Sequence, residues 1–287
     1  MALNIRTNLP SIIAQRNMAQ ATTGLQTAYE RLSSGLRINR AKDDAAGLAL
    51  AESLKADARI ASVGIRNAND GISIINITDG AIGQITNVLS RLAELAEQSA
   101  NGVLSNGQRS ALQLEFSALI SEVERIAMST EFNGLMLLSG GGTVSLQVGF
   151  DGSSISQITY SGVQATLAAL GLAAANSSAS IYSITGATEL ESQSAARLAL
   201  DAIQEAITSV VRNRGTLGAA ESRLEVTINN LQVARENFSA AESRIRDADV
   251  AAEAAELTRL TILQQAGTAI LAQANQQPSL ALQLLRG

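Results

Sequence analysis

Proline is nearly absent from this chain. The positions of the few prolines constrain the fold more than any other feature of the sequence. Two of the 287 residues are proline, Pro10 and Pro278. A proline ring removes a backbone donor and breaks helices, so the proline-free stretch 11–277 can support unusually long helices. The sequence therefore favours an extended helical architecture over a fold built from many short elements.

Apolar residues recur at spacings of three and four through two long segments. The first segment covers residues 51–100 and is interrupted by Asp79 and Thr86, and the second covers residues 196–238, where Arg214 is one of the interruptions. This heptad spacing predicts helices that pack along a seam. Because the two seams lie far apart in the sequence, we expect them to pair in antiparallel fashion.

Capping residues suggest where these helices begin and end. Asp43 or Asp44 is a plausible N-cap of the first long helix, and Asn101-Gly102 a plausible stop. At about 1.5 Å per residue, the helix would be on the order of 80 Å long. A further helix is predicted over residues 106–129, with Phe116 and Val123 on its apolar face.

Both ends of the chain carry shorter apolar repeats. Residues 14–32 form a short heptad, and residues 257–274 have one apolar face. Such short helices are marginal in isolation, so they need a partner. An apolar stripe at each end predicts self-assembly or membrane insertion, and a closed helical bundle is the simpler alternative.

The middle of the chain has few charges and many glycine and serine residues. Residues 144–148 and 155–160 alternate as strands do, and Asp151-Gly152 between them indicates a turn, which predicts a β-hairpin. We expect a short alanine-rich segment at 165–175 and another strand near 181–184. The chain is thus expected to run helices, small β insert, helices.

Composition excludes most site chemistry. The chain has no Cys, His or Trp and a formal charge of −5, so thiolate or imidazole catalysis and Cys/His zinc sites have no side chains to use. We expect no enzyme activity, cofactor or metal, and the acidic balance argues against nucleic acid as a partner. A chain without cysteine also suits an extracellular protein that travels unfolded.

Neither a cleaved signal nor a membrane span is evident. The N-terminal residues MALNIRTNLPSIIAQRN lack the long apolar region of a Sec signal. The sequence contains no apolar run near the roughly 18 residues of a membrane span. The protein is therefore expected to be cytoplasmic or to leave the cell without a cleaved signal.

Two small groups of charged residues have simple interpretations. Arg37, Arg40 and Lys42 lie between predicted helices, where intersubunit ion pairs or solvation of a loop are favoured over anion binding. Glu122 and Glu124 are two apart on a predicted helix and so face different directions. We interpret them as part of a solvated face.

Long, distinctive motifs occur near both ends of the sequence. Near the N-terminus the sequence reads YERLSSGLRINRAKDDAAGLALAESL (29–54), and near the C-terminus RIRDADVAAEAAELTRLTILQQAGTAILAQANQ (244–276). These motifs resemble those of bacterial flagellins, in the order in which they occur in that family. The likeness extends through NANDGISIINITDGA (67–81), LSRLAELAEQSAN (89–101) and STEFNGLMLLSG (129–140). It covers roughly residues 1–140 and 190–287.

The resemblance implies a mainly α fold, in which the N- and C-terminal arms form a long antiparallel helical rod and coiled coil with a small β-hairpin insert. The variable outer domains of larger relatives are nearly absent, so a thin, smooth filament is implied. The implied parts are an N-terminal inner coiled-coil arm and spoke (1–43), the N-terminal part of an outer rod domain (44–140), a small β-rich variable insert (141–188), the C-terminal rod helix (189–240) and a C-terminal inner arm (241–287).

The implied function is that of a secreted, extracellular subunit that polymerises into the bacterial flagellar filament. The same resemblance implies that the flagellar type III apparatus exports the unfolded chain with the help of a chaperone. It also implies contacts of the polymer with a cap and with hook-junction proteins. In the family, the two termini pair as the inner coiled coil. By this resemblance, the residues expected to form the self-assembly contacts are Leu9, Ile12, Leu25, Leu32, Leu263, Ile270 and Leu282.

A second surface follows from the family's recognition by the animal Toll-like receptor for flagellin. The residues that match the recognised surface are Leu89, Arg91, Leu95, Gln98 and Glu115. The resemblance implies that the monomer activates this receptor. The alternative is that these residues pack neighbouring protofilaments, and the two roles are compatible.

Two other functions share features with this sequence, and a third is excluded by its composition. A hook–filament junction protein resembles flagellin at both ends, and a membrane-active type III translocator would use the apolar termini. An enzymatic flagellin with a metalloprotease insert needs histidine ligands, which this chain lacks.

Overall fold

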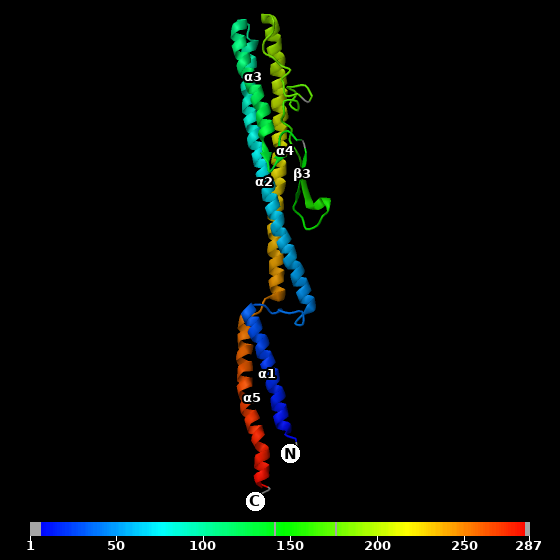
Figure 1. Ribbon diagram of the computed structural model, residues 1–287, viewed down its shortest axis with the longest axis vertical. Coiled ribbons are helices and arrows are strands. Elements are labelled where there is room, and N and C mark those ends of the chain that lie inside the picture. The colour runs from blue at the N-terminus through cyan, green and yellow to red at the C-terminus, as the bar shows by residue number, and fades with distance from the viewer. Residues whose placement is uncertain (1–6, 141, 176, 285–287) are drawn as a thin grey trace. The chain divides into compact units, whose positions relative to one another are not determined.

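The computed structural model describes residues 7–140, 142–175 and 177–284, and its account of side chains omits Ser161 and ends at residue 277. Helices dominate the described chain, with two pairs of short strands between the third and fourth helix. This confirms the predicted mainly α fold with a small β-hairpin. The helices are α1 (Leu9–Ser34), α2 (Ala45–Ala100), α3 (Asn106–Ser129), α4 (Glu189–Arg246) and α5 (Val250–Leu284) (Figure 1).

The chain divides into two units. The terminal unit comprises residues 1–58 and 236–287, and the central unit comprises residues 59–235. The terminal unit therefore contains α1 and α5, and the central unit contains α3, the strands and most of α2 and α4.

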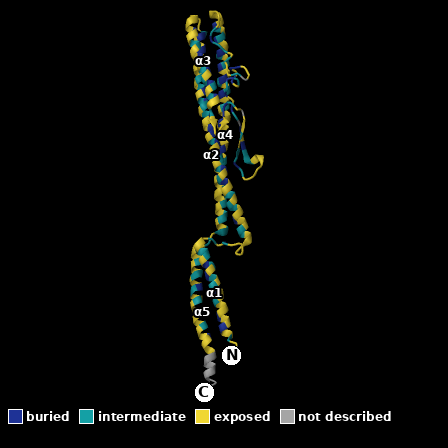
Figure 2. Cartoon of the chain, in the orientation of Figure 1, coloured by how far each residue is buried: buried dark blue, intermediate teal, exposed yellow. Residues whose placement is uncertain are grey.

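The core of the central unit lies where α2, α3 and α4 face one another. The apolar seams predicted for α2 and α4 supply buried residues such as Ile82, Leu89, Ile203 and Val210. The buried positions along these helices are dark blue in Figure 2. The helices are antiparallel, as expected.

Two residues that interrupt the predicted seams pair with each other. The guanidinium of Arg214 on α4 donates from Nε to Oδ1 of Asp79 on α2 at 2.7 Å and from Nη2 to Oδ2 at 3.0 Å. Such a two-pronged ion pair fits a charged residue into an apolar repeat without burying an isolated charge. The interruptions therefore fix the register of the two helices.

The ends of the central helices agree with the capping signals. Oδ1 of Asp44 accepts a hydrogen bond from the backbone N–H of Gly47 at 2.9 Å at the start of α2, and α2 ends at Ala100, one residue before Asn101-Gly102. Helix α3 covers the predicted range and returns along α2, with Phe116 and Val123 buried.

The predicted hairpin is formed by β3 (Thr143–Gln147) and β4 (Gln157–Ser161), which pair in antiparallel register from Thr143–Ser161 to Gln147–Gln157. It lies close against α2 at Gly64. A Cβ built there would lie 2.7 Å from the carbonyl oxygen of Val148, so only glycine permits this approach. The connection includes a 3-10 turn over Ser154–Ser156.

Two details of the segment between α3 and α4 differ from expectation. The strand predicted near 181–184 does not form, because its backbone groups find other partners. The N–H of Ile184 donates to Oε1 of Gln113, and that of Ile181 donates to the carbonyl of Leu172. A second hairpin, β1 (Glu131–Phe132) with β2 (Leu135–Met136), was not predicted although Asn133-Gly134 is a turn signal.

Candidate assembly surfaces

Helix α1 begins and ends with recognisable caps. The side chain of Asn8 accepts a hydrogen bond from the N–H of Ser11 at 3.1 Å, and Pro10 lies in the first turn, where its missing N–H is harmless. Gly35 ends the helix in a left-handed conformation with φ of 72°, which glycine adopts without strain.

Small residues bring α1 and α5 close together in the terminal unit. Ala14, Ala21 and Ala28 of α1 are buried, as is Leu260 of α5. A Cβ built on Gly24 would lie 3.0 Å from a methyl of Leu260. The pair is antiparallel and depends on few large side chains, so most of its apolar surface faces outward.

A proline within α5 is linked to the start of α1. The backbone of α5 continues helically through Pro278, which has no N–H to donate to the carbonyl four residues earlier. That carbonyl, of Ala274, instead accepts a hydrogen bond from Nδ2 of Asn8 at 2.8 Å. Ser11 Oγ donates to Oδ1 of Asn275 at 2.8 Å nearby. These polar contacts fix the register of two helices whose small apolar residues would otherwise tolerate slippage.

The predicted self-assembly residues fall into two groups. Leu25 is buried between α1 and α5 and Leu32 is half-buried, so both hold the pair together. The outward group has large exposed fractions, and the side chain of Leu282 lies outside the described residues. The outward residues are Leu9 (61% exposed), Ile12 (53%), Leu263 (46%) and Ile270 (57%).

A groove of about 730 Å³ follows one side of the α1–α5 pair. Its walls are mainly apolar and come from both helices, including Ile13, Met18, Leu263 and Ile270. Leu263 and Ile270 are one heptad apart on α5, so they present a continuous ridge beside the groove. This surface can bury another helix.

The segments that follow α1 and α4 are held together by backbone hydrogen bonds. The N–H of Arg37 donates to the carbonyl of Arg246 at 2.6 Å, and the N–H of Ala248 donates to the carbonyl of Gly35 at 2.9 Å. Asp43 closes the loop by accepting from the N–H groups of Asn39 and Arg40. The hydrogen bond from the backbone of Arg40 is the main cause of the lowered pKa of Asp43.

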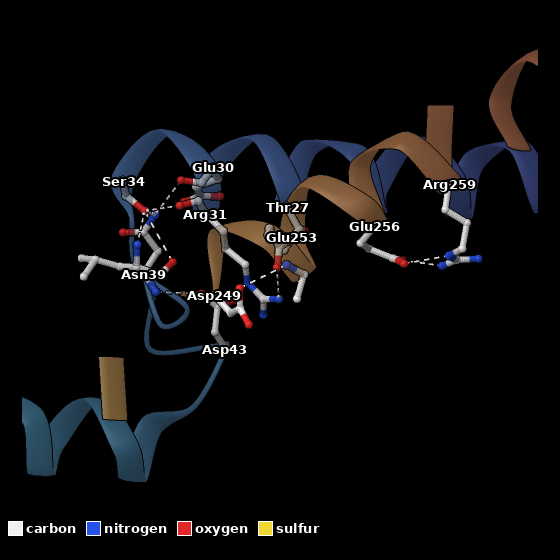
Figure 3. A network of polar contacts seen from close by, with 12 residues as sticks. Thr27, Glu30, Arg31, Ser34, Asn39, Asp43, Asp249, Glu253, Glu256 and Arg259 are labelled. Atoms are coloured by element: carbon white, nitrogen blue, oxygen red, sulfur yellow. Dashed lines mark hydrogen bonds and ion pairs between the residues drawn. The ribbon is translucent and has the colours of Figure 1, made fainter. Parts of the chain in front are cut away.

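Arginine side chains add to this junction. Arg40 pairs with Glu30 at 2.6 Å, and Nη2 of Arg37 donates to the carbonyl of Ile245. Both contacts lie within the chain, the side chain of Arg40 is still 60% exposed, and intersubunit pairing of these residues stays a prediction. Figure 3 shows Arg31 turned toward Glu253, at 3.6 Å.

The α2–α3 surface contains only part of the predicted receptor-binding set. Arg91 pairs with Glu115 at 2.8 Å on the surface, and its pKa is raised chiefly by its hydrogen bond to Glu94. Gln98 is exposed as well. Leu89 and Leu95 are 0% and 1% exposed. They were predicted as recognition residues and are corrected here, because their position on the apolar seam of α2 buries both side chains.

Three polar residues that anchor loops were not predicted or were assigned another role. Arg109 is 0% exposed and donates to the carbonyls of Ser99 in the last turn of α2, of Asn101 just after it, and of Glu189 at the start of α4. Its spacing from Phe116 placed it on the buried face and could have revealed it. Gln113 holds residues 183–184, as described above.

Glu124 is the third anchor, and its assignment to a solvated face is corrected. Its carboxylate accepts from the N–H of Leu167 at 2.8 Å and so ties the insert to α3. Glu122 pairs with Arg125 on the exposed side of the same helix, as the interpretation of a solvated face requires.

The described residues contain no group of three or more acidic, His or Cys side chains placed to hold a metal ion. Within that same part of the chain, no helix is long and apolar enough to cross a membrane. The features that stand out are the apolar outer face of the α1–α5 pair and the polar surface of α2 and α3.

Comparison with known proteins gives this arrangement a family. The profile of the bacterial flagellin N-terminal helical region matches residues 5–143, and that of the C-terminal helical region matches residues 200–285. A flagellin of Halalkalibacterium halodurans is 45% identical over 98% of this chain and 99% of its own length. The chain belongs to the bacterial flagellin family.

Another relative and a solved structure are also similar to this flagellin-family chain. The flagellar filament 33 kDa core protein of Treponema phagedenis is 39% identical over 98% of this chain and 99% of its own. The crystal structure of Bacillus cereus flagellin is 26% identical, covers 58% of this chain and 88% of its own, and superimposes with a TM-score of 0.48.

Proposed function

We propose that this chain is the structural subunit of a bacterial flagellar filament and that it polymerises through the outer face of the α1–α5 pair. The exposure of Leu9, Ile12, Leu263 and Ile270 on one helix pair carries the proposal. Fully burying a large aliphatic side chain stabilises by about 1.5–3 kcal/mol. Covering these four half-exposed side chains would therefore favour association by on the order of 3–6 kcal/mol.

The fold of α5 supports the same conclusion. Between Leu260 and Gln277 this helix has no charged side chain, and exposed Ile262 and Ile270 point away from its buried Leu260 and Ala274. Apolar residues therefore lie on more than one face of α5, and an exposed apolar face of this kind indicates a contact with a partner. Since α1 covers only one side, neighbouring copies would cover the rest.

Relatives agree with a polymeric role, since the Treponema phagedenis protein is named a flagellar filament core protein. We extend this to an extracellular location, export of the unfolded chain by the flagellar type III apparatus with its chaperone, and contacts with cap and hook-junction proteins. The small insert at 141–188 would give a thin, smooth filament. Each subunit would consist of the parts inferred from the sequence, which are 1–43, 44–140, 141–188, 189–240 and 241–287.

Seeded polymerisation tests the proposal. Purified protein is mixed with filament fragments and followed by light scattering and electron microscopy. We expect long filaments from the wild type, and a large rise in the critical concentration for Ile270→Asn. The matched control is Val103→Asn, an exposed apolar residue of the central unit (83% exposed), which should polymerise normally.

Other outcomes separate the rivals. A hook–filament junction protein would cap seeds without elongating them, and a membrane-active translocator would release dye from liposomes without forming filaments. Wild-type protein that remains monomeric on seeds at any concentration contradicts the proposal.

We also propose that the monomer activates the animal Toll-like receptor for flagellin through exposed Arg91, Gln98 and Glu115. The Arg91–Glu115 pair holds both side chains on one surface of α2 and α3. In a receptor reporter assay, Arg91→Asp should weaken the response and Arg125→Asp, on the same surface helix pair, should serve as the control. Silence of the wild-type monomer rejects this role.

A further inference from the structure

The β1–β2 hairpin forms a small rigid projection after α3. Asn133 and Gly134 have φ of 50° and 77°, the left-handed conformations of a tight two-residue turn. Phe132 and Leu135 form a cross-strand pair and are 36% and 43% exposed. The hairpin is anchored by buried Leu138. It therefore presents two apolar side chains to solvent on a fixed backbone.

A groove with matching chemistry lies elsewhere in the central unit. It has a volume of about 850 Å³ and runs between the β3–β4 hairpin and α4. Its apolar walls include Phe150, Ile155, Val226 and Leu231. Ile155 is 94% exposed and Val226 is 60% exposed, so the walls remain largely uncovered in a single chain.

Projection and groove carry opposite charges. Glu131, the first residue of β1, is exposed, and Arg223 on α4 lines the groove. Arg223 also borders the adjoining pocket toward Thr159 and Tyr160, so it lies at the end of the groove away from the hairpin tip. Among the described residues, neither Glu131 nor Arg223 forms an ion pair. Asp151, at the tip, is occupied by Ser153 and Ser156.

We propose that the β1–β2 projection of one copy inserts into the β3–β4/α4 groove of a second copy, with Glu131 paired to Arg223. Phe132 and Leu135 would fill the apolar part of the groove. Because projection and groove are different surfaces of the same chain, this contact is heterologous and propagates into an open chain of subunits rather than closing a dimer.

This inference rests on the proposed filament function and adds a defined contact to it in the central unit. Charge reversal tests the ion pair. Glu131→Arg and Arg223→Glu should each raise the critical concentration for seeded polymerisation, by about three- to tenfold. The double variant restores the opposite charges and should recover most of the loss. Circular dichroism of each monomer confirms that the fold is intact.

Cross-linking tests the position of the projection. The chain has no cysteine, so Phe132→Cys and Val226→Cys subunits can be mixed, polymerised and oxidised with copper phenanthroline. A disulfide-linked dimer should form in mixed filaments and not in filaments of either variant alone or in monomers.

The results distinguish the two proposals. If wild-type filaments grow but single reversals grow equally well, or the mixed filaments do not cross-link, the projection–groove contact is overturned and the filament function stands. Failure of the wild type to grow overturns both.

Discussion

Replacing Arg109 by methionine should destabilise the central unit more than replacing any of its exposed charged side chains. The guanidinium is fully buried and donates at 3.0, 3.2 and 2.8 Å to the carbonyls of Ser99, Glu189 and Asn101. These carbonyls lie at the end of α2 and the start of α4, so one side chain joins three helices. Methionine fills similar space but removes all three of these hydrogen bonds.

The expected loss can be worked out from these contacts. Each hydrogen bond from a charged donor contributes about 1.5–3 kcal/mol, which for three gives roughly 4–9 kcal/mol. Removing a charge from the interior recovers part of this, because burying an ion is costly. We therefore expect a net loss of about 3–5 kcal/mol, a large part of the total stability of about 5–15 kcal/mol for a typical domain.

Urea unfolding followed by circular dichroism measures the loss, and amide hydrogen exchange near residues 99–112 and 184–192 localises it. Arg125→Met is the matched control, since Arg125 pairs with Glu122 on the surface and should leave the midpoint unchanged. Arg109→Lys keeps the charge but loses the planar fork and should fall between the two. Equal midpoints for Arg109→Met and Arg125→Met would refute the reasoning.

Three further predictions concern other parts of the chain. Gly64→Ala should destabilise by about 1–3 kcal/mol because its Cβ would meet a backbone oxygen, whereas Gly80→Ala on the same helix, where nothing lies within 4 Å, should stabilise by about 0.5–1 kcal/mol; thermal unfolding reports both signs. Leu95→Ala should cost about 2–5 kcal/mol of unfolding free energy, while Arg91→Ala should leave the urea midpoint unchanged and weaken only receptor signalling. The pKa of Asp43 is lowered, so the stability that its carboxylate provides is complete above the ordinary pKa of 3.8 and is lost as the pH falls further. Proteolysis of the 35–44 segment should therefore increase only below about pH 4. The Asp43→Asn variant should be cleaved at the same rate above and below that pH.

Long helices were predictable because periodicity and caps agree along most of their length. In α2 the apolar repeat, the acid at Asp44 and the Asn101-Gly102 stop all indicate one helix, and the structure confirms it. Even the misfits were informative, since Asp79 and Arg214 interrupt two repeats and pair with each other. Local rules suffice where every signal along a segment points the same way.

The insert and the polar residues that anchor it depend on contacts distant in sequence. Residues 181–184 have strand-like side chains, but the side chain of Gln113, 71 residues away from Ile184, accepts the hydrogen bond that a neighbouring strand would have accepted. Arg109 finds its acceptors only once three helices meet. Leu89 and Leu95 were assigned to the receptor surface from a motif resemblance. Their own heptad spacing, a local signal, places both side chains in the core.

Accessibility of a thiol at position 270 tests the central claim most directly. The chain has no cysteine, so Ile270→Cys introduces a unique thiol at a site that is 57% exposed in the single chain. Its reaction with maleimide is compared in monomer, filament and urea-unfolded protein. If the outer face of the α1–α5 pair is the assembly surface, the thiol reacts quickly in the monomer and is strongly protected in the filament. Equal reaction rates in monomer and filament would contradict the account.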